Sequence, residues 1–164
     1  MPSTYTPIAT TTLGSAASSV TFSSISGSYT DLILVSSLVS TSASANIAAT
    51  VNGDTGSNYS QTFLSGNGSA ANSARNSNIS SMNFVWTSGS LNNTVGSAIM
   101  HFMNYSNTTT NKTVLARYDV AAGETTATVN LWRNTAAITS ITVSTTSNSW
   151  ASGSTFTLYG VTSA

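Results

Sequence analysis

The stretch Thr155-Phe156-Thr157-Leu158-Tyr159, near the end of the chain, alternates apolar and hydroxyl-bearing side chains. Phe156 and Leu158 face one side, and Thr157 and Tyr159 face the other. This period of two is typical of an antiparallel strand with one buried and one solvated face. The same alternation recurs in Val20–Ser23 and Ile141–Ser144. The chain is therefore expected to form β-sheets that carry Ser and Thr on their wet faces.

Short runs rich in β-branched and aromatic residues, bounded by Gly, Asn or Ser, recur along the whole chain. Residues that favour helices, such as Leu, Glu, Lys, Gln and Arg, are scarce. The pattern predicts strands at Tyr5–Leu13, Ser18–Ile25, Asp31–Ser40, Asn46–Asn52, Tyr59–Leu64, Ile79–Thr87, Thr94–Tyr105, Lys112–Val120, Thr126–Arg133, Ile138–Thr145 and Thr155–Val161.

About ten short strands at this spacing predict an all-β protein, a two-sheet antiparallel sandwich of jelly-roll type, with a closed barrel as the alternative. Leu32–Val35 and Ala98–Met103 are apolar on both faces. We expect these two runs to lie centrally, or to pack their second face against another subunit. The polar stretch Ser65–Asn78 is interpreted as a long surface loop. Residues 1–17 form an N-terminal arm or first strand, and residues 18–164 a single sandwich domain.

The composition excludes several functions. Only 5% of the residues are charged, with a formal net charge of zero, while 32 Ser, 28 Thr and 16 Asn fill 76 of 164 positions. So few charges exclude nucleic-acid binding by counterion release. The absence of cysteine excludes disulfides and cysteine metal sites. No apolar stretch approaches the roughly 20 residues of a membrane span, and Met1–Pro7 does not have the pattern of a signal peptide.

Three groups of polar residues could carry chemistry. Asn52–Asn58 resembles a calcium loop, but its single carboxylate, Asp54, predicts a hairpin turn instead. His101, the only histidine, could be a general base, but no nucleophile is held beside it in sequence, so we favour a satisfied sheet or interface histidine. Asp119 and Glu124 flank a turn and could form a glycosidase pair, yet their places at a strand end and a loop tip favour solubilising charges. We expect no enzymatic activity, no catalytic residue, no cofactor and no metal.

The three tryptophans, Trp86, Trp132 and Trp150, have two interpretations. They could form a sugar-stacking platform, because aromatic rings bind sugars by stacking beside hydrogen-bonding groups. Alternatively they fill the core or a subunit interface. An exposed stripe and a buried row have the same spacing in sequence, and we favour the interpretation that the tryptophans fill the core or a subunit interface.

The scarcity of charge also predicts self-association. Charged surfaces usually keep copies of a monomer apart, and this chain offers mainly hydroxyls and amides. Neutral hydrogen bonds of that kind are screened little by salt and suit a fixed symmetric assembly. We therefore expect a homo-oligomer, with a homotrimer as the favoured state.

Several segments form an ordered pattern over about residues 20–161: Phe22-Ser23-Ser24-Ile25-Ser26-Gly27-Ser28-Tyr29-Thr30-Asp31-Leu32, Asn52–Tyr59, Leu64–Gly68, Asn104-Tyr105 with Lys112-Thr113, Trp132-Arg133 with Ala137–Ile141, and Gly153-Ser154-Thr155-Phe156-Thr157-Leu158-Tyr159-Gly160-Val161. In this order and combination they resemble small virion structural proteins of tailed bacteriophages.

This resemblance implies an all-β sandwich built into a phage particle, as a head decoration (cement) protein or as a tail or fibre component. It supplies no catalytic residue. We expect the sandwich to have no shaft and no added enzymatic domain, and this expectation favours capsid decoration. The alternative is a tail or fibre component whose sandwich binds a host glycan through Trp86, Trp132 or Trp150.

On the decoration hypothesis the partners are further copies of the chain and the major capsid protein or another virion protein. No nucleic acid or membrane is involved, and the virion would assemble in the host cytoplasm. A trimer would bridge capsid subunits at a symmetry axis by apolar burial and sheet-edge contacts. The segment Pro2–Leu13 would reach a neighbouring subunit, so deletion of residues 2–12 should abolish incorporation into particles while leaving the sandwich folded. The candidate contact residues in it are Pro2, Tyr5, Pro7 and Ile8.

Overall fold

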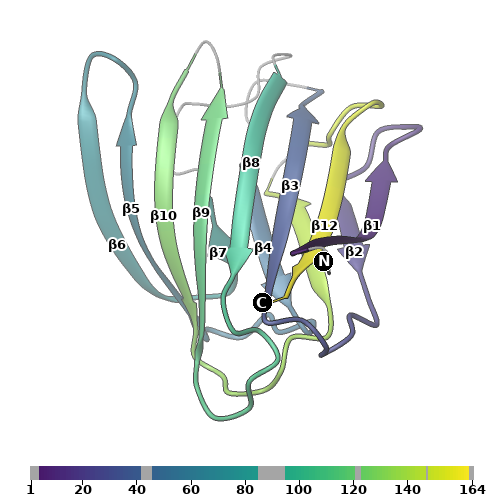
Figure 1. Cartoon of the computed structure of the whole chain (residues 1–164). Coiled ribbons are helices and arrows are strands. Elements are labelled where there is room, and N and C mark those ends of the chain that lie inside the picture. The colour runs from purple at the N-terminus through teal and green to yellow at the C-terminus, as the bar shows by residue number, and fades with distance from the viewer. Residues whose placement is uncertain (1–3, 42–45, 85–94, 121–122, 147, 163–164) are drawn as a thin grey trace.

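The computed structural model describes residues 4–41, 46–84, 95–120, 123–146 and 148–162, and their regular structure is entirely β-strand (Figure 1). These ranges hold no helix that could cross a membrane. The strands are β1 (Tyr5–Thr12), β2 (Ser19–Phe22), β3 (Asp31–Val39), β4 (Ile47–Val51), β5 (Tyr59–Gly66), β6 (Ala71–Ile79), β7 (Met82–Asn83), β8 (Val95–Phe102), β9 (Lys112–Val120), β10 (Thr125–Trp132), β11 (Ile141–Thr145) and β12 (Thr155–Val161).

The strands form two sheets in which every pairing is antiparallel. The larger sheet has the order β1-β12-β3-β8-β9-β10-β5-β6, and the smaller has the order β2-β11-β4-β7. In Figure 1 the larger sheet is in front, and β4 and β7 lie behind it. The chain crosses between the sheets repeatedly. The predicted two-sheet antiparallel sandwich is confirmed, and the sheet is open rather than closed into a barrel because β1 and β6 are its two edges.

The core fills the space between the sheets because alternate residues of each strand point inward. In β8, Ala98, Met100 and Phe102 are buried, whereas Ser97 and Ile99 are exposed. The largest side chains of this core include Trp132, Trp150, Tyr59 and Tyr105, all fully buried. Burial of apolar surface at about 25 cal/mol per Å² is the main favourable term in folding such a sandwich.

The prediction that Leu32–Val35 and Ala98–Met103 lie centrally is confirmed. Apart from Met103, which directly follows β8, they belong to β3 and β8, which pair with each other as the third and fourth strands of the eight. Their second apolar face points away from the smaller sheet and remains at the surface, where Val35 and Ile99 are exposed.

The prediction of a loop over Ser65–Asn78 is wrong. These residues end β5, turn at Asn67–Ala70 and form β6, which pairs with β5 from Ala71 to Ile79. The sequence did not predict this strand because it lies at the sheet edge and is exposed on both faces. Its sequence therefore shows no alternation of apolar and polar residues. The predicted strand Ile79–Thr87 is reduced in the described residues to the two-residue β7, and residues 85–87 lie outside them.

Candidate functional site

The outer face of the eight-stranded sheet, the side away from the smaller sheet, carries the exposed apolar side chains of the described chain. Alternation along β3, β8, β9, β10 and β5 sends the buried residues inward and leaves the intervening ones on this face. The most exposed is Leu64, at 64%. The large exposed hydrophobic residues are Tyr5, Val35, Leu64, Val95, Ile99, Leu115 and Val129 in strands of this sheet, and Met103 directly after β8.

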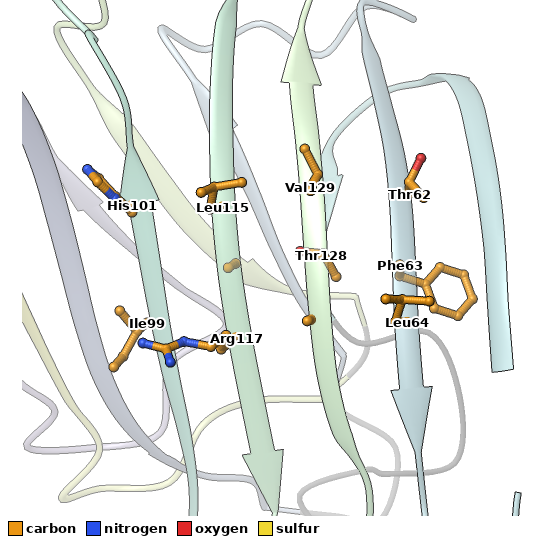
Figure 2. Close-up of a pocket in the computed structure, with 11 residues that line it drawn as sticks. Thr62, Phe63, Leu64, Ile99, His101, Leu115, Arg117, Thr128 and Val129 are labelled. Carbon is orange, nitrogen blue, oxygen red and sulfur yellow. The ribbon is translucent and has the colours of Figure 1, made fainter. Parts of the chain in front are cut away.

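The middle of this face is hollowed to a volume of about 420 Å³ (Figure 2). Two rows of side chains cross it at neighbouring register positions. One row runs from Ile99 through Arg117 and Ala127 to Leu64, and the other runs from His101 through Leu115 and Val129 to Thr62. The hollow is therefore an apolar surface interrupted by one arginine and one histidine.

Arg117 is the charged residue at the centre of this apolar surface. Its register neighbours are Ile99 on β8 and Ala127 on β10. The guanidinium makes no hydrogen bond or ion pair with any residue that the structure describes.

Two other cations, by contrast, have partners. Arg133 donates to Asn78 Oδ1 at 2.8 Å, and Lys112 donates to the carbonyls of Thr110 and Thr135 at 2.7 and 2.9 Å. Burial lowers the pKa of Lys112.

His101 lies at the rim of the hollow and pairs with Asp31, which the sequence had not connected to it. Nε2 of His101 lies 2.8 Å from Oδ2 of Asp31, and the backbone N–H of Asn104 donates to Oδ1 at 2.6 Å. Asp31 thus joins the start of β3 to the turn after β8. Asp119 and Glu124, the carboxylates nearest to His101 in sequence, are not hydrogen-bonded to it. The imidazole has a structural partner that fits the prediction of a sheet histidine.

Asp119 and Glu124 have different environments. Asp119 is exposed on the outer face. Glu124 is 4% exposed and accepts a 2.8 Å hydrogen bond from Thr126 Oγ1, so the expectation that it solubilises a loop tip is wrong. The described residues also contain no group of three His, Cys, Asp or Glu side chains that could hold a metal ion.

Asn52–Asn58 forms the tight turn that its sequence predicts, with positive φ at Asn52 (53°) and Gly53 (67°). It is not a hairpin, however, because β4 and β5 belong to different sheets. The carboxylate of Asp54 accepts hydrogen bonds from Trp132 Nε1 (2.7 Å), Asn58 Nδ2 (2.9 Å) and the Gly56 N–H (2.9 Å). The Trp132 bond chiefly holds the pKa of Asp54 below its usual value, against the opposing effect of burial. These donors satisfy the carboxylate within the protein.

The described tryptophans are buried. Trp132 and Trp150 are each 0% exposed, and the Trp150 ring packs on Phe156 with centroids 4.8 Å apart. A ring without solvent exposure offers no face for a sugar, so neither residue can provide the stacking that the glycan-binding alternative requires. Trp86 lies outside the described residues.

The candidate contact residues of the N-terminal segment lie in β1, apart from Pro2, which is outside the described residues. Tyr5 and Pro7 are exposed, whereas Ile8 is half-buried and packs against the core. β1 pairs with β12 of the same chain from Tyr5 to Thr12.

Segments that carry the phage resemblance meet one another in the fold. The ring of Tyr29 lies over Gly160, where an added Cβ would be 2.4 Å from Cγ. Tyr105 Oη donates to the Ser26 carbonyl. Asn52 donates through Nδ2 to the Ala137 carbonyl at 2.7 Å and accepts through Oδ1 from the Thr139 N–H at 2.8 Å. These segments hold loops and sheet ends together.

Sequence reasoning missed the outer face as a whole. Its signal was the occurrence of apolar residues on both faces of central strands, recognised for β3 and β8. The same signal exists in Val114-Leu115-Ala116 of β9, and Val129 and Leu131 add apolar residues to the outer positions of β10.

No protein-family model and no curated protein matches this chain. Among solved structures, a galectin from Caenorhabditis elegans is 12% identical with a TM-score of 0.37, covering 94% of this chain and 96% of the galectin. An exo-inulinase from Aspergillus awamori is 10% identical with a TM-score of 0.38. That match covers 96% of this chain but only 29% of the enzyme. A protein of unknown function from Shewanella oneidensis MR-1 is 8% identical with a TM-score of 0.26, covering 98% of this chain and 77% of that one. These TM-scores are all below 0.5, so no function is transferred from these proteins.

Proposed function

We propose that this chain is a structural protein of a tailed-phage particle, and within it a capsid decoration (cement) protein that works as a homo-oligomer. The proposal starts from the virion-protein resemblance of the segments between residues 20 and 161. The observation that carries it further is the outer face of the eight-stranded sheet, where Leu64, Leu115 and Val129 are exposed around the hollow. Contiguous exposed apolar surface of this kind marks an interaction site.

The proposed partner of the outer face is another virion protein, the major capsid protein first. The hollow in this face combines an apolar surface with the guanidinium of Arg117, which has no partner among the described residues. The apolar side chains of a protein partner would bury the apolar surface, and a carboxylate of that partner would neutralise the Arg117 guanidinium. Burial at about 25 cal/mol per Å² would then strengthen contacts between capsid subunits.

The burial of Trp132 and Trp150 gives no support to a glycan-binding tail or fibre component. A tail position without glycan binding is distinguished from a head position by copy number. We would purify phage particles that encode the chain and quantify it against the major capsid protein by mass spectrometry. Hundreds of copies per particle are expected. A dozen or so would assign the protein to the tail, and its absence from the particle would overturn the proposal.

A further inference from the structure

Strand β6 is an open edge of the larger sheet. It is nine residues long, pairs with β5 on one side, and is the last strand in the sheet order of the described chain. Seven of its nine residues are exposed and the other two are half-buried. A long edge strand of this kind is a template for pairing with a further strand.

The direction of the backbone groups along β6 follows from the turn that precedes it. The Asn67 N–H donates to the Ala70 carbonyl at 3.2 Å, so these two residues form a hydrogen-bonded pair. Hydrogen-bonded and non-hydrogen-bonded pairs alternate in an antiparallel ladder, and the register is regular as far as Ser77. Asn72, Ala74 and Asn76 therefore bond to β5. The residues that direct N–H and C=O toward the open edge are Ala71, Ser73, Arg75 and Ser77.

The opposite edge of the sheet, β1, is protected. Pro7 has no N–H to donate, and a register irregularity between Pro7 and Ala9 interrupts the strand. Both features block strand addition. β6 has no proline, and Arg75 is its only charged residue. Pairing of β1 of one copy with β6 of the next would produce a ring or an open filament, and the protected β1 edge disfavours it. Pairing of β6 with β6 of a second copy is the remaining arrangement.

We propose that β6 pairs antiparallel with β6 of a second copy about a two-fold axis at Ala74. In this register Ala71 pairs with Ser77 of the second copy, and Ser73 pairs with its Arg75. All four edge-directed residues of each copy then exchange both backbone hydrogen bonds. The two larger sheets become one continuous sheet, a strand-addition contact between identical chains.

The side chain of Arg75 selects this register. An axis at Arg75 would place Arg75 directly opposite its own copy, and like charges directly opposite are destabilising. An axis at Ala74 places Arg75 opposite Ser73 instead. It also places Asn76 opposite Asn72 of the second copy.

This inference goes beyond the proposed function and does not depend on it. The β6 contact uses the sheet edge, so the outer face around Arg117 remains available to another virion protein. The contact is two-fold, whereas the sequence predicted a trimer, and the size of the assembly in solution separates the two.

The first experiment measures that size by sedimentation of the recombinant full chain. We expect a dimer of twice the 16.8 kDa chain mass. Concentrations up to about 200 μM are used, since a strand-edge contact belongs to the class of small, weak interfaces. Ser73→Pro removes an edge-directed N–H but no bond to β5, and should weaken the dimer at least tenfold. The matched control, Thr12→Pro, changes an exposed position of β1 and should remain dimeric.

The second experiment tests the register, using the absence of cysteine from the chain. Ala74→Cys should form a disulfide-linked dimer on mild oxidation, because the axis brings the two copies of this position together as a non-hydrogen-bonded pair. Asn72→Cys and Asn76→Cys should each fail to cross-link alone but should cross-link when mixed.

A wild-type monomer over the whole concentration range, a trimer, or a dimer that Ser73→Pro leaves intact would each overturn the proposal. If Ser73→Pro does not fold, the cross-linking result decides. Efficient cross-linking of Asn76→Cys to itself, without cross-linking of Ala74→Cys, would overturn the register.

Discussion

The indole Nε1 of Trp132 donates a 2.7 Å hydrogen bond to the carboxylate of Asp54, 78 positions earlier in the chain. Trp132 ends β10 and Asp54 lies in the turn between β4 and β5, so the bond ties the larger sheet to the crossover from the smaller one. Tyr59 adds a second link, since its hydroxyl donates to the Asp54 carbonyl at 2.8 Å. Burial raises the pKa of Tyr59 to about 12, which keeps the hydroxyl protonated as a donor.

Replacing the carboxylate should therefore destabilise the fold. We expect Asp54→Asn to lower the free energy of unfolding by about 2 kcal/mol, because hydrogen bonds to a charged group are lost or weakened. Urea denaturation followed by tryptophan fluorescence measures the change. The control is Asp119→Asn, which removes an exposed carboxylate and should change stability by less than about 0.5 kcal/mol. Equal effects of the two substitutions would contradict the role given to Asp54.

The same carboxylate predicts a pH dependence. Its pKa is lower in the folded protein than its ordinary value, which is about 3.9. The stabilisation is therefore fully present above that ordinary value and is lost as the pH falls through the lower folded pKa. Thermal unfolding of the wild type and Asp54→Asn between about pH 7 and pH 2.5 should show curves that converge at the acidic end. A constant difference over that range would refute the linkage.

The contact of Tyr29 with Gly160 predicts the effect of one added methyl group. A Cβ at Gly160 would lie 2.4 Å from the Tyr29 ring, so Gly160→Ala should cost about 1–3 kcal/mol of stability through overpacking. In the double variant with Tyr29→Ala the costs should not add, because the clash is gone. Gly14→Ala is the control, since nothing lies within 4 Å of its added Cβ. Additive losses would show that the ring is not the obstacle.

If the outer face contacts the virion, a substitution on it should reduce attachment of the protein to the particle without changing its folding stability. Leu115→Asp places a charge on that face and should strongly lower the copy number of the protein in purified particles, because the partner would have to bury the carboxylate. Chemical denaturation should show a change within about 1 kcal/mol, since Leu115 is already exposed. Thr21→Asp makes the matching change at an exposed position of the smaller sheet. If both variants attach normally, the outer face is not the contact.

The pairing of β1 with β12 changes the expected effect of deleting residues 2–12. The deletion would remove a strand that pairs along its length with β12 and would expose the backbone of β12. We expect a lower midpoint of thermal unfolding and a greater tendency to aggregate, as unprotected edges promote pairing between chains. Unchanged thermal unfolding would instead restore the interpretation of these residues as a detachable arm.

The sequence by itself determined the fold class and most strand positions of this protein. Local alternation in segments such as Val20–Phe22 and Phe156–Leu158 is set by which face each residue shows to water. That information is therefore contained in a few neighbouring residues. β6 was missed for the same reason, because a strand with both faces exposed has no such alternation.

Only the tertiary structure decided which strands are neighbours and which distant residues meet. Asp31 with His101, Asp54 with Trp132, and Tyr29 with Gly160 are each more than 60 positions apart. Such contacts depend on the order of strands in the sheets and on the crossovers between them, which alternation within one strand does not encode. The outer face arose in the same way, since Ile99, Leu115, Val129 and Leu64 form one surface only when β8, β9, β10 and β5 lie side by side.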